Sequence, residues 1–402
     1  MAPRYNLTLP ESKEQPTTQR AQSRAHRSSS GGLAWYSAWA MPFANRRTVH
    51  LENDLVRLSF LPGGGHIAAV TLRSNGVNPL WNPIWETIDP SRYDAAKHPE
   101  YGGGSEPKLL SGIVGHNLCF DLFGVPSEEE LAGGLPVHGD ASIADWEFES
   151  HPGELGAWAH FPYCQMNFER RMRLNPGSQV VVITETAENL LGIDRPVGWT
   201  QHVTIGPPFL EKGKTMFHAP ATQSKVYEGD FAPGGQDRFQ RGAEFRWPMG
   251  PLTGGGTADM RLTVNTPVGG ALTTHLMDPA GAQGFFTAFH PDQKTSFGYI
   301  WKRSDFPWLC IWEENYSRTY KPWNGKSLTR GMEFGASPFP ETRKEMLARN
   351  GLFGERGYRW VPARAKVTVE YCLFIAETGE ALETVVWKDG KVRGSGGFEL
   401  AV

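Results

Sequence analysis

The feature that most constrains the fold is a succession of short strand-like segments, separated by turn residues, that extends from Leu51 to Ala376. The clearest member is Gln165–Leu174, in which apolar and charged residues alternate with the period of two that is typical of a half-buried strand. The turn sequence Asn-Pro-Gly-Ser follows at 175–178, and a run rich in β-branched residues, Val180–Asn189, comes after it. This part of the chain therefore predicts a β-hairpin.

The same pattern recurs along the chain and predicts an all-β protein, a large antiparallel β-sandwich in which residues 33–402 form one domain. Helix is expected only at Glu341–Asn350, with a brief helical turn at Ser127–Leu131. Residues 1–32 have almost no large apolar side chains, and we expect them to form a disordered tail. The further strands that we expect are Val56–Phe60, Ile67–Leu72, Phe285–His290, Ser296–Lys302, Leu309–Tyr316 and Lys366–Ala376.

Composition excludes several classes of partner. The net charge of −3 gives no reason to expect a nucleic-acid partner, and no run of about 18 apolar residues predicts a membrane span. The N-terminus lacks an apolar signal core, and the four cysteines lie far apart without a CxxC pair. We therefore expect free thiols, buried in strands, and a cytoplasmic protein.

The stretch Gly198–Phe209, with the sequence GWTQHVTIGPPF, contains candidate functional residues. His202 lies near the end of an expected strand, which a Gly-Pro-Pro turn terminates. Trp199 offers a flat apolar face, and Gln201 both donates and accepts hydrogen bonds, so both suit the binding of a polar ring such as a sugar. The alternative is an ordinary core histidine beside a structural tryptophan.

Two more neighbourhoods offer reactive groups. His138 precedes a glycine and small residues, so a ligand could approach the backbone closely, and Glu333 lies among apolar and small residues. His66, His218 and His275 are interpreted as ordinary structural histidines. The spacing of the histidines matches no zinc motif, and there is no P-loop or GxSxG elbow, so we expect neither a metal nor a cofactor.

Four segments, in this order, resemble the galactose mutarotase-like superfamily of aldose 1-epimerases and hexose-6-phosphate epimerases. They are ENDLVRLSFLPGGGHIAAVTL, LPVHGDASIADWEF, WTQHVTIGPPF, and LCIWEENY followed by TRGMEFGASPFP. KVTVEYCLFIA stands where the closing strand of the family would be. The resemblance covers about Leu51 to Ala376 and implies the supersandwich fold of that superfamily, with a sugar as the small-molecule ligand.

The resemblance also implies roles for single residues. His138 would hold the sugar, His202 would be the general acid and Glu333 the general base. The remaining residues expected to contact the substrate are His116, Asn117, Trp199, Gln201, Trp312 and Glu314.

This chain departs from the family pattern at three positions. Gln201 rather than asparagine precedes the histidine, and Phe334 rather than proline follows the glutamate. No arginine matches the arginine of the family, and His116-Asn117 occupies about that place. Glu313 or Glu314 is therefore a rival for the base.

Three functions remain open from the sequence. The first is an isomerase of the aldose 1-epimerase (mutarotase) type, acting on the anomeric carbon of a hexose or related sugar. The second is a carbohydrate-binding protein without turnover. The third is a polysaccharide-cleaving enzyme that uses Tyr316, Arg318 and Tyr320. We expect a monomer or a homodimer.

Overall fold

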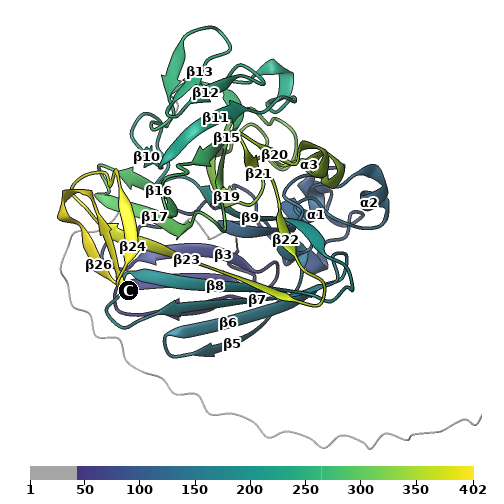
Figure 1. Cartoon of the computed structure of the whole chain (residues 1–402), viewed down its shortest axis with the longest axis horizontal. Helices are drawn as coiled ribbons and strands as arrows, with labels where there is room; N and C mark the ends of the chain where they lie inside the picture. Colours follow the sequence, from purple (N-terminus) through teal and green to yellow (C-terminus); the bar gives the residue numbers. More distant parts are fainter. Residues whose placement is uncertain (1–42, 264) are drawn as a thin grey trace, which may run out of the picture. The chain divides into compact units, whose positions relative to one another are not determined.

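In the computed structural model, which describes residues 43–263 and 265–402, two large antiparallel sheets make up most of the protein (Figure 1). The predicted all-β class and antiparallel sandwich are confirmed. The described residues belong to one compact unit. The tail predicted for residues 1–32 lies outside the described residues.

The larger sheet carries the candidate site. Its central strands come from distant parts of the sequence, so the sheet brings together residues that are more than 200 positions apart. In order across the sheet, the strands are β1 (Val49–Glu52), β2 (Val56–Leu61), β3 (His66–Leu72), β4 (His116–Asp121), β9 (Arg195–Ile205), β19 (Leu328–Gly335), β18 (Trp308–Asn315), β15 (Gly269–Met277), β11 (Ala221–Val226) and β12 (Glu244–Arg246), and β22 (Arg359–Val361) also pairs with β9.

The smaller of the two sheets has eight strands and contains the hairpin predicted around position 176. In that hairpin, the amide of Ser178 donates to the carbonyl of Asn175, and Gly177 has a φ of 71°, which suits glycine. The strands in order are β10 (Met216–His218), β16 (Gln283–His290), β17 (Thr295–Lys302), β23 (Lys366–Glu377), β8 (Val180–Asn189), β7 (Met166–Leu174), β6 (Glu154–Phe161) and β5 (Glu147–His151).

Smaller elements complete the fold. A three-stranded sheet near the C-terminus packs through Val385 and Val392, together with Leu382 just before it, on apolar side chains of the eight-stranded sheet. The small sheets are β24–β25–β26 (Val385–Lys388, Lys391–Gly394, Glu399–Ala401), β13–β14 (Met249–Pro251, Thr257–Asp259) and β20–β21 (Gly351–Leu352, Glu355–Arg356); the α-helices are α1 (Pro107–Leu110), α2 (Glu128–Ala132) and α3 (Arg343–Arg349).

Local sequence explains the two predicted helical segments. In α3, the side chain of Thr342 accepts from the amide of Glu345, whose carboxylate accepts from the amide of Thr342, so two free amides at the start of the helix are satisfied. Asn350, in the left-handed conformation, ends the helix. Ser127 and Glu130 form the same capping box at the start of α2. The helix predicted at Glu341–Asn350 is therefore confirmed, slightly shortened at both ends.

The two large sheets pack face to face through aromatic side chains. Phe334 of β19 stacks on Trp301 of β17, with ring centroids 4.2 Å apart, and Trp199 of β9 lies edge-to-face against Phe168 of β7 at 5.4 Å. All four cysteines are buried and free, as the sequence predicted. The outward face of the larger sheet is left for loops, α1 and a second apolar cluster that includes Trp312 and Trp323.

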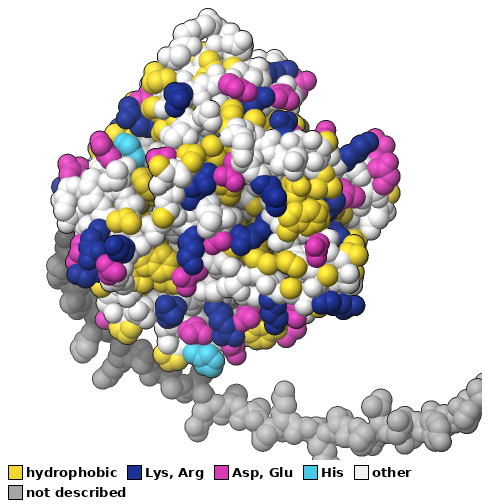
Figure 2. Space-filling model, viewed as in Figure 1, with side chains coloured by type: hydrophobic (Ala, Val, Ile, Leu, Met, Phe, Trp, Pro, Cys, Tyr) yellow, Lys and Arg dark blue, Asp and Glu magenta, His cyan; other side chains and the backbone are white. Residues whose placement is uncertain are grey.

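On the surface seen in Figure 2, basic and acidic side chains are interspersed. Within the described ranges, no helix is long and apolar enough to cross a membrane.

Candidate active site

Strand register brings three of the predicted site residues side by side. Asn117 of β4 pairs with His202 of β9. On the other side of β9, Gly331 pairs with Thr204 and Phe334 with Gln201, so Glu333 lies opposite His202. Alternate residues of a strand point to opposite faces of the sheet. The side chains of Asn117, His202 and Glu333 therefore share the outward face of the larger sheet.

His202 and Glu333 are in direct contact. The Nε2 atom of His202 is 2.7 Å from Oε1 of Glu333, and Nδ1 of His202 lies 3.1 Å from the hydroxyl oxygen of Thr204. The exposed fractions are only 5% for His202 and 3% for Glu333. The site thus holds a carboxylate and an imidazole, side by side, with little competing water.

The contact does not use up the hydrogen-bonding capacity of Glu333. Among the described residues, its buried Oε1 has no hydrogen-bond partner of good geometry, despite the short distance to His202. Buried polar atoms without partners are uncommon in folded proteins. This oxygen can therefore accept a hydrogen bond from a hydroxyl group of a ligand that displaces His202.

His138 approaches the pair from a loop. Its ring centroid is 5.2 Å from that of His202, and its Nδ1–H donates to the carbonyl of Phe123 at 2.5 Å. Burial lowers the pKa of His138 to about 3, and the charges of His202 and Arg318 act in the same direction. His138 is therefore neutral near pH 7, and its Nε2 can accept a hydrogen bond from a ligand.

Aromatic rings and one arginine lie beside the histidines. The ring of Trp312 is 5.8 Å from that of His202 and 6.1 Å from that of Trp323. The guanidinium of Arg318 lies 4.9 Å from the centroid of the Trp323 ring and 5.6 Å from that of Trp312. Trp81 stacks on Trp323 at 5.8 Å. Flat aromatic faces next to hydrogen-bonding groups suit a ring that has both apolar and polar edges.

Three of the predicted substrate contacts lie elsewhere. Trp199, Gln201 and His116 face the interior between the two large sheets and are fully buried. Gln201 donates to Glu185 at 2.6 Å, the indole of Trp199 donates to the same carboxylate at 3.0 Å, and His116 lies 2.9 Å from Gln201 Oε1. The structure therefore gives them a role in the core and corrects their assignment to the sugar site.

The structure also separates the rival carboxylates. Glu313 points to the face opposite that of Glu333 and forms ion pairs with Arg238 at 2.8 Å and Arg330 at 3.1 Å. Glu314 shares the face of Trp312, but its carboxylate accepts from the amides of Ser317 and Arg318. Glu333 is therefore the carboxylate that lies next to His202.

Two further expectations concern metals and the tyrosines. Among the described residues, there is no group of three or more His, Cys, Asp or Glu side chains that could hold a metal ion. Tyr316 packs under the ammonium group of Lys212, and Tyr320 is 48% exposed, whereas Arg318 lies against Trp323. The three residues therefore differ in their surroundings.

The sequence interpretation missed Trp323 and the place of Arg318. Trp323 follows a proline in a turn-rich stretch, and Arg318 belongs to the segment YSRTY, which resembles a solvated loop. The buried Glu314 accepts from two backbone amides and the hydroxyl of this loop and so folds it over the sheet. The position of the acidic Glu314 just before a polar loop was the feature of the sequence that could have indicated this fold of the loop.

Comparison with solved structures decides the fold family. A proposed aldose 1-epimerase from Klebsiella pneumoniae superposes with a TM-score of 0.58 at 14% identity, over 81% of this chain and 77% of that one. A galactose mutarotase-like protein from Clostridium acetobutylicum gives 0.54 at 13%, over 84% and 97%. The chain has the galactose mutarotase-like fold.

A galactose mutarotase related enzyme from Lactobacillus acidophilus is similar in the same way, with a TM-score of 0.52 at 12% identity, over 83% of this chain and 99% of that one. No protein-family model matches this sequence, and no curated protein matches it. Identities this low support the galactose mutarotase-like fold without fixing the activity.

Proposed function

We propose that the protein is an isomerase of the aldose 1-epimerase type, which interconverts the anomers of a hexose or related sugar. The observation that carries the proposal is the pairing of His202 and Glu333 at 2.7 Å on neighbouring strands, with the neutral His138 beside them. The fold supports the same activity, because a structure described as a proposed aldose 1-epimerase and another described as a galactose mutarotase-like protein share it.

The reaction needs two proton transfers at one carbon. A base removes the proton of the anomeric hydroxyl while an acid protonates the ring oxygen; the ring opens, the carbonyl turns over, and the ring closes on its other face. Both oxygens are bonded to the anomeric carbon. Two side chains on adjacent strands can therefore reach both, once the sugar replaces their contact with each other.

Each residue has a distinct task in this mechanism. Glu333 accepts the hydroxyl proton, and His202 donates a proton to the ring oxygen. His138 accepts a hydrogen bond from a sugar hydroxyl through Nε2, and Trp312 covers an apolar face of the ring. Burial excludes water that would otherwise compete for these protons.

The experiment is polarimetry of freshly dissolved pure anomers of glucose, galactose and their 6-phosphates, with and without the protein. We expect accelerated approach to anomeric equilibrium for at least one of these sugars, with a rate proportional to protein concentration. Saturable sugar binding, measured by calorimetry, without any acceleration would support the carbohydrate-binding alternative instead.

A further inference from the structure

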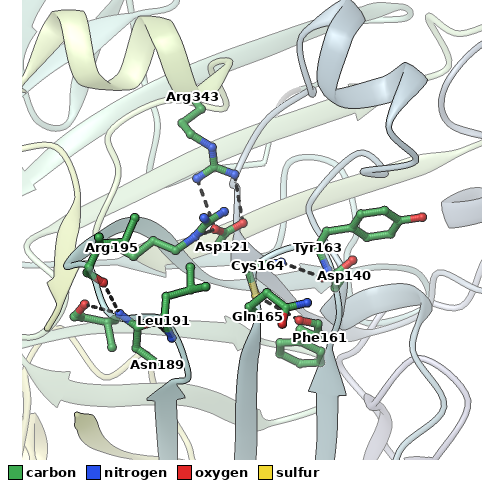
Figure 3. A network of polar contacts seen from close by, with 12 residues as sticks. Asp121, Asp140, Phe161, Tyr163, Cys164, Gln165, Asn189, Leu191, Arg195 and Arg343 are labelled. Carbon is green, nitrogen blue, oxygen red and sulfur yellow. Dashed lines mark hydrogen bonds and ion pairs between the residues drawn. The ribbon is translucent and has the colours of Figure 1, made fainter. Parts of the chain in front are cut away.

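The loop that carries His138 is held against the turn between β6 and β7. Asp140 follows His138 by two residues, and its Oδ2 atom accepts from the amides of Tyr163 at 3.0 Å and Cys164 at 3.4 Å. Figure 3 shows this carboxylate beside the turn. Only 3% of Asp140 is exposed.

The backbone of this loop is sharply bent next to Asp140. His138 and Gly139 are both left-handed, with φ values of 66° and 76°. A Cβ atom on Gly139 would lie 2.0 Å from the carbonyl oxygen of Phe120, so a larger residue does not fit. The position of His138 therefore depends on a closely packed loop in which Asp140 supplies the contact to the β6–β7 turn.

The charges around Asp140 leave it without a counter-ion. The nearest buried carboxylate, Asp121 of β4, forms ion pairs with Arg195 at 2.7 Å and Arg343 at 3.1 Å (Figure 3). Within the described part of the chain, no lysine or arginine lies at ion-pair distance from Asp140. The other titratable groups that face it are His160 of β6 and the thiol of Cys164, and the phenol of Tyr163 belongs to the same turn.

This isolation determines how Asp140 responds to pH. Burial raises the pKa of Asp140 to about 6, and the two amide hydrogen bonds lower it only in part. In an opened loop the carboxylate would meet water, where its pKa would be about 3.9. The closed form binds the proton more tightly, so it is favoured at low pH and loses that advantage as the pH rises from about 4 to about 6.

We propose that Asp140 acts as a latch on the His138 loop, and that the loop opens more readily at neutral than at acidic pH. The inference rests on the proposed function only for the role of the opening, which is to admit a sugar. His202 and Glu333 are nearly covered in the closed structure, and a sugar needs a movement of this kind to reach them.

The test is hydrogen–deuterium exchange, followed by mass spectrometry, of peptides that cover residues 133–140 and 161–165. Rates at pH 4.5 and pH 7.0 are divided by those of the same peptides in unstructured form, which removes the intrinsic effect of pH. The matched variants are Asp140→Asn, which removes the charge, and Asp145→Asn, which removes an exposed charge on the same segment. No sugar is needed, so failure of the proposed function leaves this test intact.

In the unmodified protein, the corrected exchange of both segments should rise by about twentyfold between the two pH values, which follows from the difference between pKa values of 3.9 and 6. Asp140→Asn should stay at the slow rate at both pH values, and Asp145→Asn should behave as the unmodified protein. If Asp140→Asn does not fold, Asp140→Ser is held to the same expectation. Equal corrected rates in the unmodified protein, or an undiminished rise in the uncharged variant, would overturn the proposal.

Discussion

The substitution Gly331→Ala tests the position of Glu333 without replacing any residue that takes part in proton transfer. A Cβ atom added to Gly331 would lie 2.8 Å from Oε1 of Glu333 and 3.2 Å from its Cδ, whereas ordinary contact begins at 3.4 Å. The carboxylate oxygen must therefore retreat by about 0.6 Å, the difference between 3.4 and 2.8 Å. The three nearest atoms all belong to this one flexible side chain, so the backbone is not disturbed.

A displacement of that size should reduce kcat/KM for anomer interconversion by about tenfold, because misplacement by about 1 Å costs roughly a hundredfold. The free energy of unfolding should change by less than about 1 kcal/mol. Polarimetry and urea denaturation measure the two quantities. In the background of Glu333→Gln the same substitution should add less than about twofold, because the affected group is already removed. Unchanged activity in Gly331→Ala, or full additivity in the double variant, would refute the assigned position and role of Glu333.

Three further predictions concern charge in the interior. Glu185→Leu leaves Arg170 buried without its partner at 2.7 Å and should lower the free energy of unfolding by about 3–5 kcal/mol. The control Glu149→Gln, which removes one member of an exposed ion pair, should lower it by less than about 1 kcal/mol. Equal effects of the two substitutions in urea denaturation would contradict this prediction. Burial lowers the pKa of His275 to about 3, so only the unfolded chain gains its proton between pH 7 and 5. His275→Gln should therefore remove about 2 kcal/mol of the stability lost over that interval, and an unaltered pH slope would be the contrary result. Because the pKa of His138 is about 3, its ring nitrogens should show no titration by NMR between pH 5 and 8, and a midpoint in that range would disprove its neutrality.

The fold could be inferred from the sequence because its signals are local. The hairpin β7–β8 can be recognised from the alternation of apolar and charged residues and from its turn sequence, and α3 from its capping residues. Each of these elements can therefore be predicted from its own residues, without knowing which elements it packs against. The order of the sheet, in which β9 lies between β4 and β19, is set by contacts between distant segments and was not predicted from the sequence.

The site was predicted less completely, for a physical reason. Nearly every residue of β9 is buried, since both faces of the strand are covered, so its sequence does not show which side chains face which way. His202 and Gln201 are equally plausible ligands by residue type. The structure distinguishes them, because the side chain of Gln201 donates to the buried Glu185 between the sheets and so does not face the same side as His202. Successive side chains of a strand point to opposite faces of the sheet, and this places Glu313 on the face opposite that of Glu333. The sequence alone left both residues as candidates for the general base.

The most direct test of the central claim is the rate of anomer interconversion by His202→Asn and Glu333→Gln, measured by polarimetry on the sugar that the unmodified protein converts fastest. Each variant removes one proton transfer and should slow the reaction at least about a hundredfold, with unchanged circular dichroism. The controls His151→Asn and Glu149→Gln, which alter an exposed histidine and carboxylate on the β5 strand, should match the unmodified protein. Full activity in either His202→Asn or Glu333→Gln would contradict the assignment of acid and base.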